Sequence, residues 1–79
     1  MVVVRYFAGA RAAAGVAEEK VSAATVAELL ESLTAAHGNR LAAVLPACSL
    51  LIDGLACRDY SAALPVDAVV DVLPPFAGG

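Results

Sequence analysis

Hydrophobic and polar positions along the chain predict five strands and one main helix. Residues 2–7 are β-branched or aromatic apart from Arg5, which is typical of a strand. Residues 16–22 alternate weakly between apolar and polar side chains, as in an edge strand. Between them, residues 8–15 are bounded by glycines, and we expect at most one helical turn there.

The main helix is predicted after Thr25. Thr25 and Glu28 have the spacing of a capping box, in which each side chain bonds a free backbone N–H at the helix start. Apolar residues then recur at helical spacing: Val26, Leu29, Leu30 and Leu33. Gly38 fits a left-handed C-cap, and His37 in the last turn is interpreted as a cation at the negative end of the helix dipole.

The second half of the chain predicts a short helical stretch and three strands. Residues 40–45 can form that stretch, which Pro46 ends. Residues 48–58 indicate a hairpin with Asp53-Gly54 in a type I′ turn. The expected cross-strand pairs are Ile52 with Leu55, Leu51 with Ala56, and Leu50 with Cys57. An irregular segment over residues 59–67 leads to a last strand at 69–73.

This order predicts an α+β fold in which one helix covers one face of a mixed sheet of four or five strands. Strand parity gives the helix-facing side chains: Val2, Val4, Tyr6, Leu50, Ile52, Leu55, Cys57, Val70 and Val72. It also gives the outward ones: Val3, Arg5, Phe7, Ser49, Leu51, Ala56, Val69, Asp71 and Leu73. The outward set is rich in apolar residues. A contiguous apolar patch on that face would mark a partner surface.

Composition narrows the class of protein. With 79 residues, of which 61% are hydrophobic, the chain is expected to form one domain. The net charge of -3 and five scattered basic residues argue against nucleic-acid binding. Residues 41–52 form the longest uncharged run, which Pro46 interrupts and which is shorter than the roughly 20 residues of a membrane span. Residues 1–5 do not resemble a signal peptide. We therefore expect a soluble cytoplasmic protein without a membrane segment.

The chain offers no obvious catalytic group or metal site. His37 is the single histidine, and the helix end accounts for it. Cys48 and Cys57 would lie diagonally on the hairpin with Cβ atoms roughly 5–7 Å apart, too far for a disulfide. Both are interpreted as small buried hydrophobes. The segment from Gly9 to Gly15 lacks the Gly-Lys-Ser/Thr ending of a phosphate loop. The domain is therefore not expected to be an enzyme by itself.

The C-terminal residues suggest chemistry of another kind. Pro74-Pro75 favours an extended projecting backbone, and Phe76-Ala77-Gly78-Gly79 follows. Two glycines contribute nothing to packing, but they can pass through a narrow channel and deliver a terminal carboxylate to another protein. We thus divide the chain into a domain over residues 1–75 and a flexible tail over 76–79.

These features resemble one family over the full length of the chain. The resemblance rests on residues 3–8, Arg11, Gly15, the helix from Thr25 to Leu33, residues 52–54 and residues 72–79. The chain is similar to the ubiquitin-like β-grasp sulfur carriers (the MoaD/ThiS family), and most to the MoaD-type small subunits of molybdopterin synthase. It departs from the family pattern at Ala12, where an acidic residue is common, and at Asp67-Ala68, where a Gly-Asp turn is usual.

The resemblance implies a role in molybdenum cofactor biosynthesis. A ubiquitin-activating-type (MoeB-type) enzyme would adenylate the Gly79 carboxylate, and a sulfur donor would convert the acyl-adenylate to a thiocarboxylate. The large (MoaE-type) subunit would then take up the tail and pass the sulfur to cyclic pyranopterin monophosphate, with no cofactor bound to the small subunit. The tail residues to be inserted are Pro74, Pro75, Phe76, Ala77 and Gly78. The expected partner-interface residues are Phe7, Arg11, Leu51, Ala56 and Leu73, and for Arg11 a purely structural role is also open.

Three other functions are compatible with the same sequence. The chain could carry sulfur for the thiazole of thiamin, although Pro74-Pro75 favours the molybdopterin branch. It could be a binding-only β-grasp module whose glycines are incidental. It could also be a modifier joined to lysines through an isopeptide bond.

Overall fold

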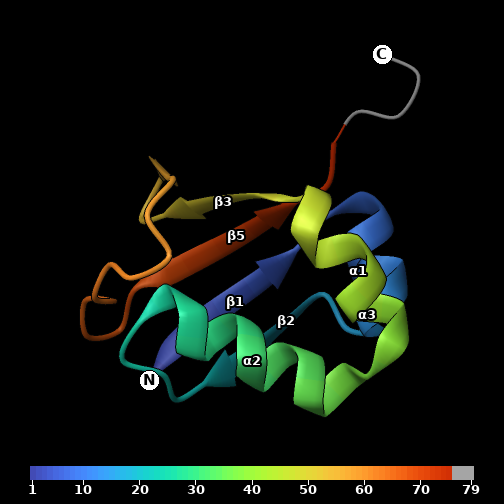
Figure 1. The fold of residues 1–79 in the computed structure, drawn as a ribbon, viewed down its shortest axis with the longest axis horizontal. Coiled ribbons are helices and arrows are strands. Elements are labelled where there is room, and N and C mark those ends of the chain that lie inside the picture. The colour runs from blue at the N-terminus through green and yellow to red at the C-terminus, as the bar shows by residue number, and fades with distance from the viewer. Residues whose placement is uncertain (76–79) are drawn as a thin grey trace.

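A five-stranded sheet forms one layer of the domain. The computed structural model describes residues 1–75 of the chain. The strands are β1 (Val2–Tyr6), β2 (Glu18–Val21), β3 (Ser49–Ile52), β4 (Leu55–Cys57) and β5 (Val69–Leu73). They are ordered β2-β1-β5-β3-β4 (Figure 1). The central pair, β1 and β5, is parallel and the other pairs are antiparallel, so the sheet is mixed, as predicted.

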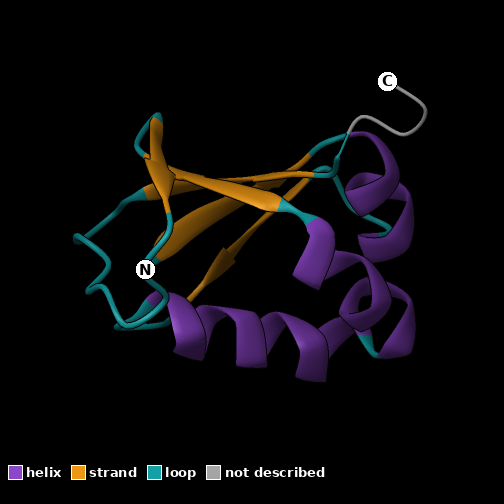
Figure 2. Cartoon of the chain, turned by 45° about the horizontal axis from the view of Figure 1, so that its top comes forward, coloured by secondary structure: helices purple, strands orange, loops and turns teal. Residues whose placement is uncertain are grey.

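The helices form the second layer and cover one face of this sheet (Figure 2). They are α1 (Ala8–Ala14), α2 (Val26–His37) and α3 (Asn39–Val44), followed by the 3₁₀ turn η1 (Leu45–Ala47). The predicted main helix is α2. Pro46 lies within η1, so the helical stretch predicted over residues 40–45 continues into a tighter turn instead of ending there.

The core lies between the two layers. Most sheet residues predicted to face the helix are buried there: Val2, Val4, Tyr6, Leu50, Val70 and Val72. Leu29 and Leu33 of α2 and Leu41 of α3 are also fully buried in this core. Leu55 was assigned to the core from strand parity, and this is wrong, because its side chain is 75% exposed. Leu55 follows the hairpin turn on the outermost strand, where a correct parity does not guarantee burial.

The β3–β4 hairpin has the predicted register. Leu50 pairs with Cys57 and Ile52 with Leu55. Asp53 and Gly54 both have positive φ, 50° and 86°, as a type I′ turn requires. Asp53 also holds β5, because its Oδ1 accepts a hydrogen bond from the Val69 N–H at 2.9 Å.

The capping box predicted at the start of α2 is half formed. Thr25 Oγ1 accepts a hydrogen bond from the Glu28 N–H at 3.2 Å, as predicted. Glu28 Oε1, however, accepts from the N–H of Ala24 at 3.4 Å, one residue before the N-cap Thr25. At the other end Gly38 has the positive φ expected of a C-cap (75°). Its ψ of -156° is not left-handed helical, however, because Gly38 is also the N-cap of α3 and directs the chain straight into that helix.

The first helix is longer than predicted. Residues 8–15 were expected to hold at most one helical turn, but α1 spans seven residues. Ala10 and Ala14, four residues apart, lie on the same side of α1 and are buried. Their small side chains let α1 pack closely against α3. Gly15, with φ 81°, ends the helix by donating its N–H to the Arg11 carbonyl at 2.9 Å.

Candidate partner-binding face and tail exit

The sheet face opposite the helices carries the candidate site, and no described helix covers it (Figure 2). Of the apolar residues predicted there, Val3, Leu51, Val69 and Leu73 are half-buried and Phe7 is 39% exposed. Apolar side chains at these positions are not needed by the core, which lies on the other side. They form a surface suited to a protein partner. We call it the outer face.

Phe7 is positioned on the outer face by two charged residues. Arg5 donates to Asp71 through Nε and Nη2, at 2.6 Å to Oδ1 and 2.9 Å to Oδ2. The Arg5 guanidinium carbon lies 5.8 Å from the centroid of the Phe7 ring, a cation–π contact. The hydrogen bonds to Asp71, and then its charge, raise the pKa of Arg5 above its ordinary value. Asp71 does lie on the outward side of β5, as predicted, but it is buried.

A hollow of about 620 Å³ lies where the chain leaves the sheet. Its lining comes from the ends of three strands and the start of α1: Phe7, Ala8, Gly9, Ser49, Leu73, Pro74 and Pro75. The Phe7 N–H donates to the Val72 carbonyl at 3.2 Å, which holds the end of β1 beside the end of β5. The tail-insertion residues Pro74 and Pro75 therefore start at this hollow. Phe76, Ala77, Gly78 and Gly79 lie outside the described residues.

The structure brings most of the predicted interface residues onto one face. Phe7 and Leu73 meet at the tail exit. Leu51 and Ala56 are paired across β3 and β4 on the same face. Arg11 is not on the sheet: it lies on α1, one helical turn after Phe7, with an exposed side chain. Four of the five predicted interface residues thus share the outer face.

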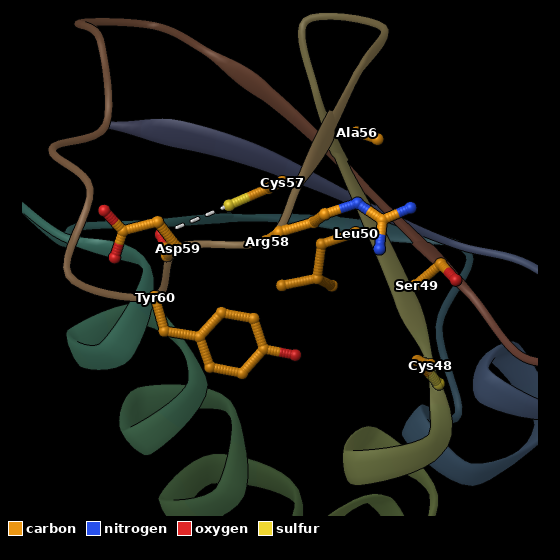
Figure 3. Close-up of a pocket in the computed structure, with 8 residues that line it drawn as sticks. All are labelled: Cys48, Ser49, Leu50, Ala56, Cys57, Arg58, Asp59 and Tyr60. Atoms are coloured by element: carbon orange, nitrogen blue, oxygen red, sulfur yellow. Dashed lines mark hydrogen bonds between the residues drawn. The ribbon is translucent and has the colours of Figure 1, made fainter.

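The two cysteines lie beside a second hollow, of about 460 Å³, next to β4 (Figure 3). Both thiols are free, as predicted. Cys48 is buried, and its S–H donates to the Val44 carbonyl at 3.3 Å. Burial raises the pKa of the Cys48 thiol, which makes it a weak nucleophile. Cys57 donates to the Asp59 carbonyl at 3.5 Å. These contacts are structural and give no catalytic pair.

A polar cluster on the helix side of the sheet was not predicted. Tyr6 donates its hydroxyl to Glu19 Oε2 at 2.6 Å, and His37 Nε2 contacts the same oxygen. The Tyr6 and His37 rings meet edge to face at 5.9 Å. Burial, and then the bond to Glu19, raise the pKa of Tyr6 far above that of a free phenol. Although Glu19 lies on the edge strand β2, its side chain is therefore held inside this cluster, and His37 is not simply a helix cap.

The sequence did contain a signal for this cluster. Glu19 pairs with Val4, so strand parity places the two side chains on the same face of the sheet. Because Val4 is a core residue, Glu19 must also point inward and needs a partner. Among residues 1–75, no three His, Cys, Asp or Glu side chains are grouped as metal ligands would be. No helix in this part of the chain is both long and apolar enough to cross a membrane.

Comparisons with known proteins give a matching family and several similar structures. The model of the ThiS family matches residues 4–79. The solution structure of small archaeal modifier protein 1 from Methanosarcina acetivorans has a TM-score of 0.88 at 28% identity, covering 99% of this chain and 95% of that one. A putative molybdopterin converting factor, subunit 1, from Pyrococcus furiosus has a TM-score of 0.84 at 27% identity, covering 95% and 97%.

A third similar structure contains a partner. In the complex of subunits 1 and 2 of molybdopterin-converting factor from Helicobacter pylori 26695, the matching chain has a TM-score of 0.77 at 23% identity, covering 99% of this chain and 97% of that one. A search of curated protein sequences gives no match. The structural similarities confirm the predicted ubiquitin-like β-grasp fold.

Proposed function

The chain belongs to the ThiS family, and from this premise we propose that it is a sulfur carrier whose cargo site is the C-terminal carboxylate of Gly79. The observation that supports this most is the tail exit. The last strand ends at Leu73, beside an apolar face that no described helix covers and a hollow bordered by the start of α1, and the family model continues from there through Gly79. A partner can therefore grip the outer face while it takes in the tail.

The chemistry follows from the terminal group. A C-terminal carboxyl has a reference pKa of about 3.3–3.7 and is an anion at neutral pH. It attacks the α-phosphate of ATP and forms an acyl-adenylate, and pyrophosphate leaves. A sulfide-equivalent donor then displaces AMP from the carbonyl carbon and gives the thiocarboxylate. The thiocarboxylate sulfur then bonds to its acceptor, and water cleaves the acyl C–S bond, which leaves the sulfur on the acceptor and restores the carboxylate. The small domain provides the surface that the partners bind, and the partners provide the catalytic groups.

We propose the molybdopterin branch of this chemistry. The Pyrococcus furiosus structure is described as subunit 1 of a molybdopterin converting factor, and it is similar to this chain over nearly its whole length. Pro74 and Pro75 fix an extended backbone at the hollow, so residues 76–79 would project into a channel of the partner. The proposed partners are a large (MoaE-type) subunit, which holds cyclic pyranopterin monophosphate, and a MoeB-type adenylating enzyme.

The direct experiment changes the terminus. We expect deletion of Gly79, or addition of one residue after it, to abolish sulfur transfer to cyclic pyranopterin monophosphate in a reconstituted reaction. Both variants should unfold at the temperature of the wild type. Ala77→Gly keeps the length and the final Gly-Gly pair, and serves as the matched control that should retain transfer. Molybdopterin formation at the wild-type rate without Gly79 would refute the proposal.

Mass spectrometry can then identify the cargo. Replacement of one oxygen by sulfur adds almost the same mass as oxidation of Met1, Cys48 or Cys57, so the intact mass alone is ambiguous. An alkylating reagent that traps the thiocarboxylate, followed by fragmentation, should place the label on the fragment that contains Gly79. Labels confined to the two cysteines would contradict the thiocarboxylate.

A modifier function is the second candidate, because one similar structure is a small archaeal modifier protein. A modifier would form an isopeptide bond between Gly79 and a lysine of another protein. Mass spectrometry of proteins from the source cells would then show lysines carrying the residues that follow Arg58, because Arg58 is the last basic residue before Gly79. A thiamin carrier would instead support thiazole formation with the corresponding synthase. Each outcome excludes transfer to the pterin as the sole function.

A further inference from the structure

Arg58 is a cation without an ion-pair partner among the described residues, and it lies next to the tail exit. The ion pairs within residues 1–75 use Arg5, His37 and the N-terminal amine, but not Arg58. The neighbouring carboxylate of Asp59 accepts instead from the backbone N–H and hydroxyl of Ser61, at 2.9 and 2.6 Å. These bonds lower the pKa of Asp59. Figure 3 shows the Asp59 carboxylate pointing away from the Arg58 guanidinium.

The strand register places Arg58 close to the point where the tail leaves. Leu73 pairs with Ser49, and Leu50 pairs with Cys57 in the next ladder. Continuing that antiparallel ladder by one residue puts Arg58 opposite Ser49. Two strand spacings, roughly 10 Å, then separate the backbones of Leu73 and Arg58. Ser49 lines both the tail-exit hollow and the hollow beside β4, so the two hollows are adjacent.

A protein whose interface is centred on the tail exit therefore also covers Arg58. A standard interface buries about 800 Å² on each partner, a patch that extends well beyond 10 Å from its centre. Covering a cation removes its water, and an unpaired buried charge opposes association. On the same face Arg5 meets no such difficulty, because Asp71 already neutralises it. Arg58 has to be neutralised by the partner.

We propose that the protein that accepts the tail carries an Asp or Glu side chain that pairs with Arg58 at the hollow beside β4. This hollow is lined by Leu50, Cys57 and Tyr60 as well as Arg58, so it can admit the apolar part of such a side chain below the guanidinium (Figure 3). The inference rests on the proposed function only in requiring that a partner takes up the tail. It assigns a charged recognition point to the β4 edge of the outer face.

The test compares two charge reversals in the full-length chain. Arg58→Glu and Arg40→Glu change the net charge equally, but Arg40 is exposed on α3, in the helix layer. Calorimetry with the large subunit of molybdopterin synthase, and separately with the adenylating enzyme, gives the two affinities. We expect Arg58→Glu to weaken binding by more than about tenfold and Arg40→Glu by less than about twofold. Added salt should reduce the difference.

The outcomes separate this inference from the proposed function. Equal effects of the two reversals with a partner that binds would overturn the role of Arg58 while the sulfur-carrier function stands. Binding to the adenylating enzyme but not to the large subunit would refute the molybdopterin branch, and a loss of about tenfold on that enzyme with Arg58→Glu alone would still support the role of Arg58. Restored affinity when one carboxylate of the partner is changed to Lys against Arg58→Glu would identify the pairing residue. Binding to neither protein would overturn both proposals.

Discussion

Asp71 accepts both hydrogen bonds of the Arg5 guanidinium, from Nε at 2.6 Å and from Nη2 at 2.9 Å, across the parallel pair of β1 and β5. The carboxylate is buried while the arginine side chain is half exposed, so Arg5 covers an acid that the sheet has removed from water. The pair joins the two central strands and also holds Arg5 over the Phe7 ring. One ion pair thus links sheet stability to the geometry of the outer face.

Neutralising this acid should therefore destabilise the sheet. Asp71→Asn keeps the size of the side chain but weakens the bonds to Arg5, and we expect it to lower the Tm. Glu18→Gln is the matched control, because Glu18 is the exposed acid opposite Arg5 on β2. It should change the Tm little. Equal shifts for the two variants in thermal unfolding would mean that the buried bonds to Asp71 add nothing to stability.

The Tyr6 hydroxyl should make the protein sensitive to alkaline pH. Its pKa is raised by burial and by the bond to Glu19, so the folded state keeps a proton that the unfolded state loses near pH 10. The contribution of Tyr6 to stability is then unchanged below pH 10 and falls as the pH rises above it, by at most about 1.4 kcal/mol per pH unit. The raised pKa of the Cys48 thiol adds a fall of its own. Urea unfolding between pH 9 and 11 measures this slope.

Two phenylalanine variants make that experiment specific. Tyr6→Phe removes the phenol and should reduce the slope to the part that the Cys48 thiol causes. Tyr60→Phe should leave the slope in place, since Tyr60 is 42% exposed and lies outside the core. A slope that is as steep in Tyr6→Phe as in the wild type would show that another group controls the alkaline transition.

The α1–α3 contact should depend on the small size of Ala10. Its side chain is fully buried, so Ala10→Leu forces extra methylenes between the two helices and is expected to cost about 1–3 kcal/mol. Ala12→Leu, on the exposed side of α1, should stay within about 0.5 kcal/mol of the wild type. Chemical denaturation of both variants compares them. Similar losses at the two positions would show that the contact is not tightly packed.

Alanine explains why α1 was the element least visible in the sequence. Strands and α2 carry Val, Leu and Ile at regular spacing, and that pattern predicted their bounds and the hairpin register closely. Ala10 and Ala14 do not stand out as a core stripe among further alanines. Their burial depends on α3, which approaches from more than 20 residues away in the sequence. Local pattern cannot report such a contact.

The contacts of the buried polar side chains could not be predicted either, because their partners are distant in the sequence. Parity placed Asp71 on the outward side correctly, but only the pairing of β1 with β5 shows that Arg5 covers it. The same holds for Glu19 and His37, which come from β2 and the end of α2. The side of the sheet on which Phe7 and Leu73 lie, in contrast, could be predicted. Leu73 ends β5 and Phe7 directly follows β1, two strands whose alternation is clear, and both residues line the tail-exit hollow.

The outer face should bind through Phe7 and Leu73. Truncating either side chain removes an apolar anchor at the tail exit, and we expect Phe7→Ala to weaken binding to the large subunit by about 2 kcal/mol, roughly thirtyfold. Its cost to folding should be smaller, because Phe7 is 39% exposed and lies outside the core. Leu73→Ala should also weaken binding more than it lowers stability. Its loss of stability should nevertheless exceed that of Phe7→Ala, since Leu73 is half-buried. Val66→Ala, at a site 87% exposed in the loop before β5, is the control and should alter neither quantity. If the folded Phe7 and Leu73 variants bound as tightly as the Val66 variant, the partner would have to bind another surface of the domain.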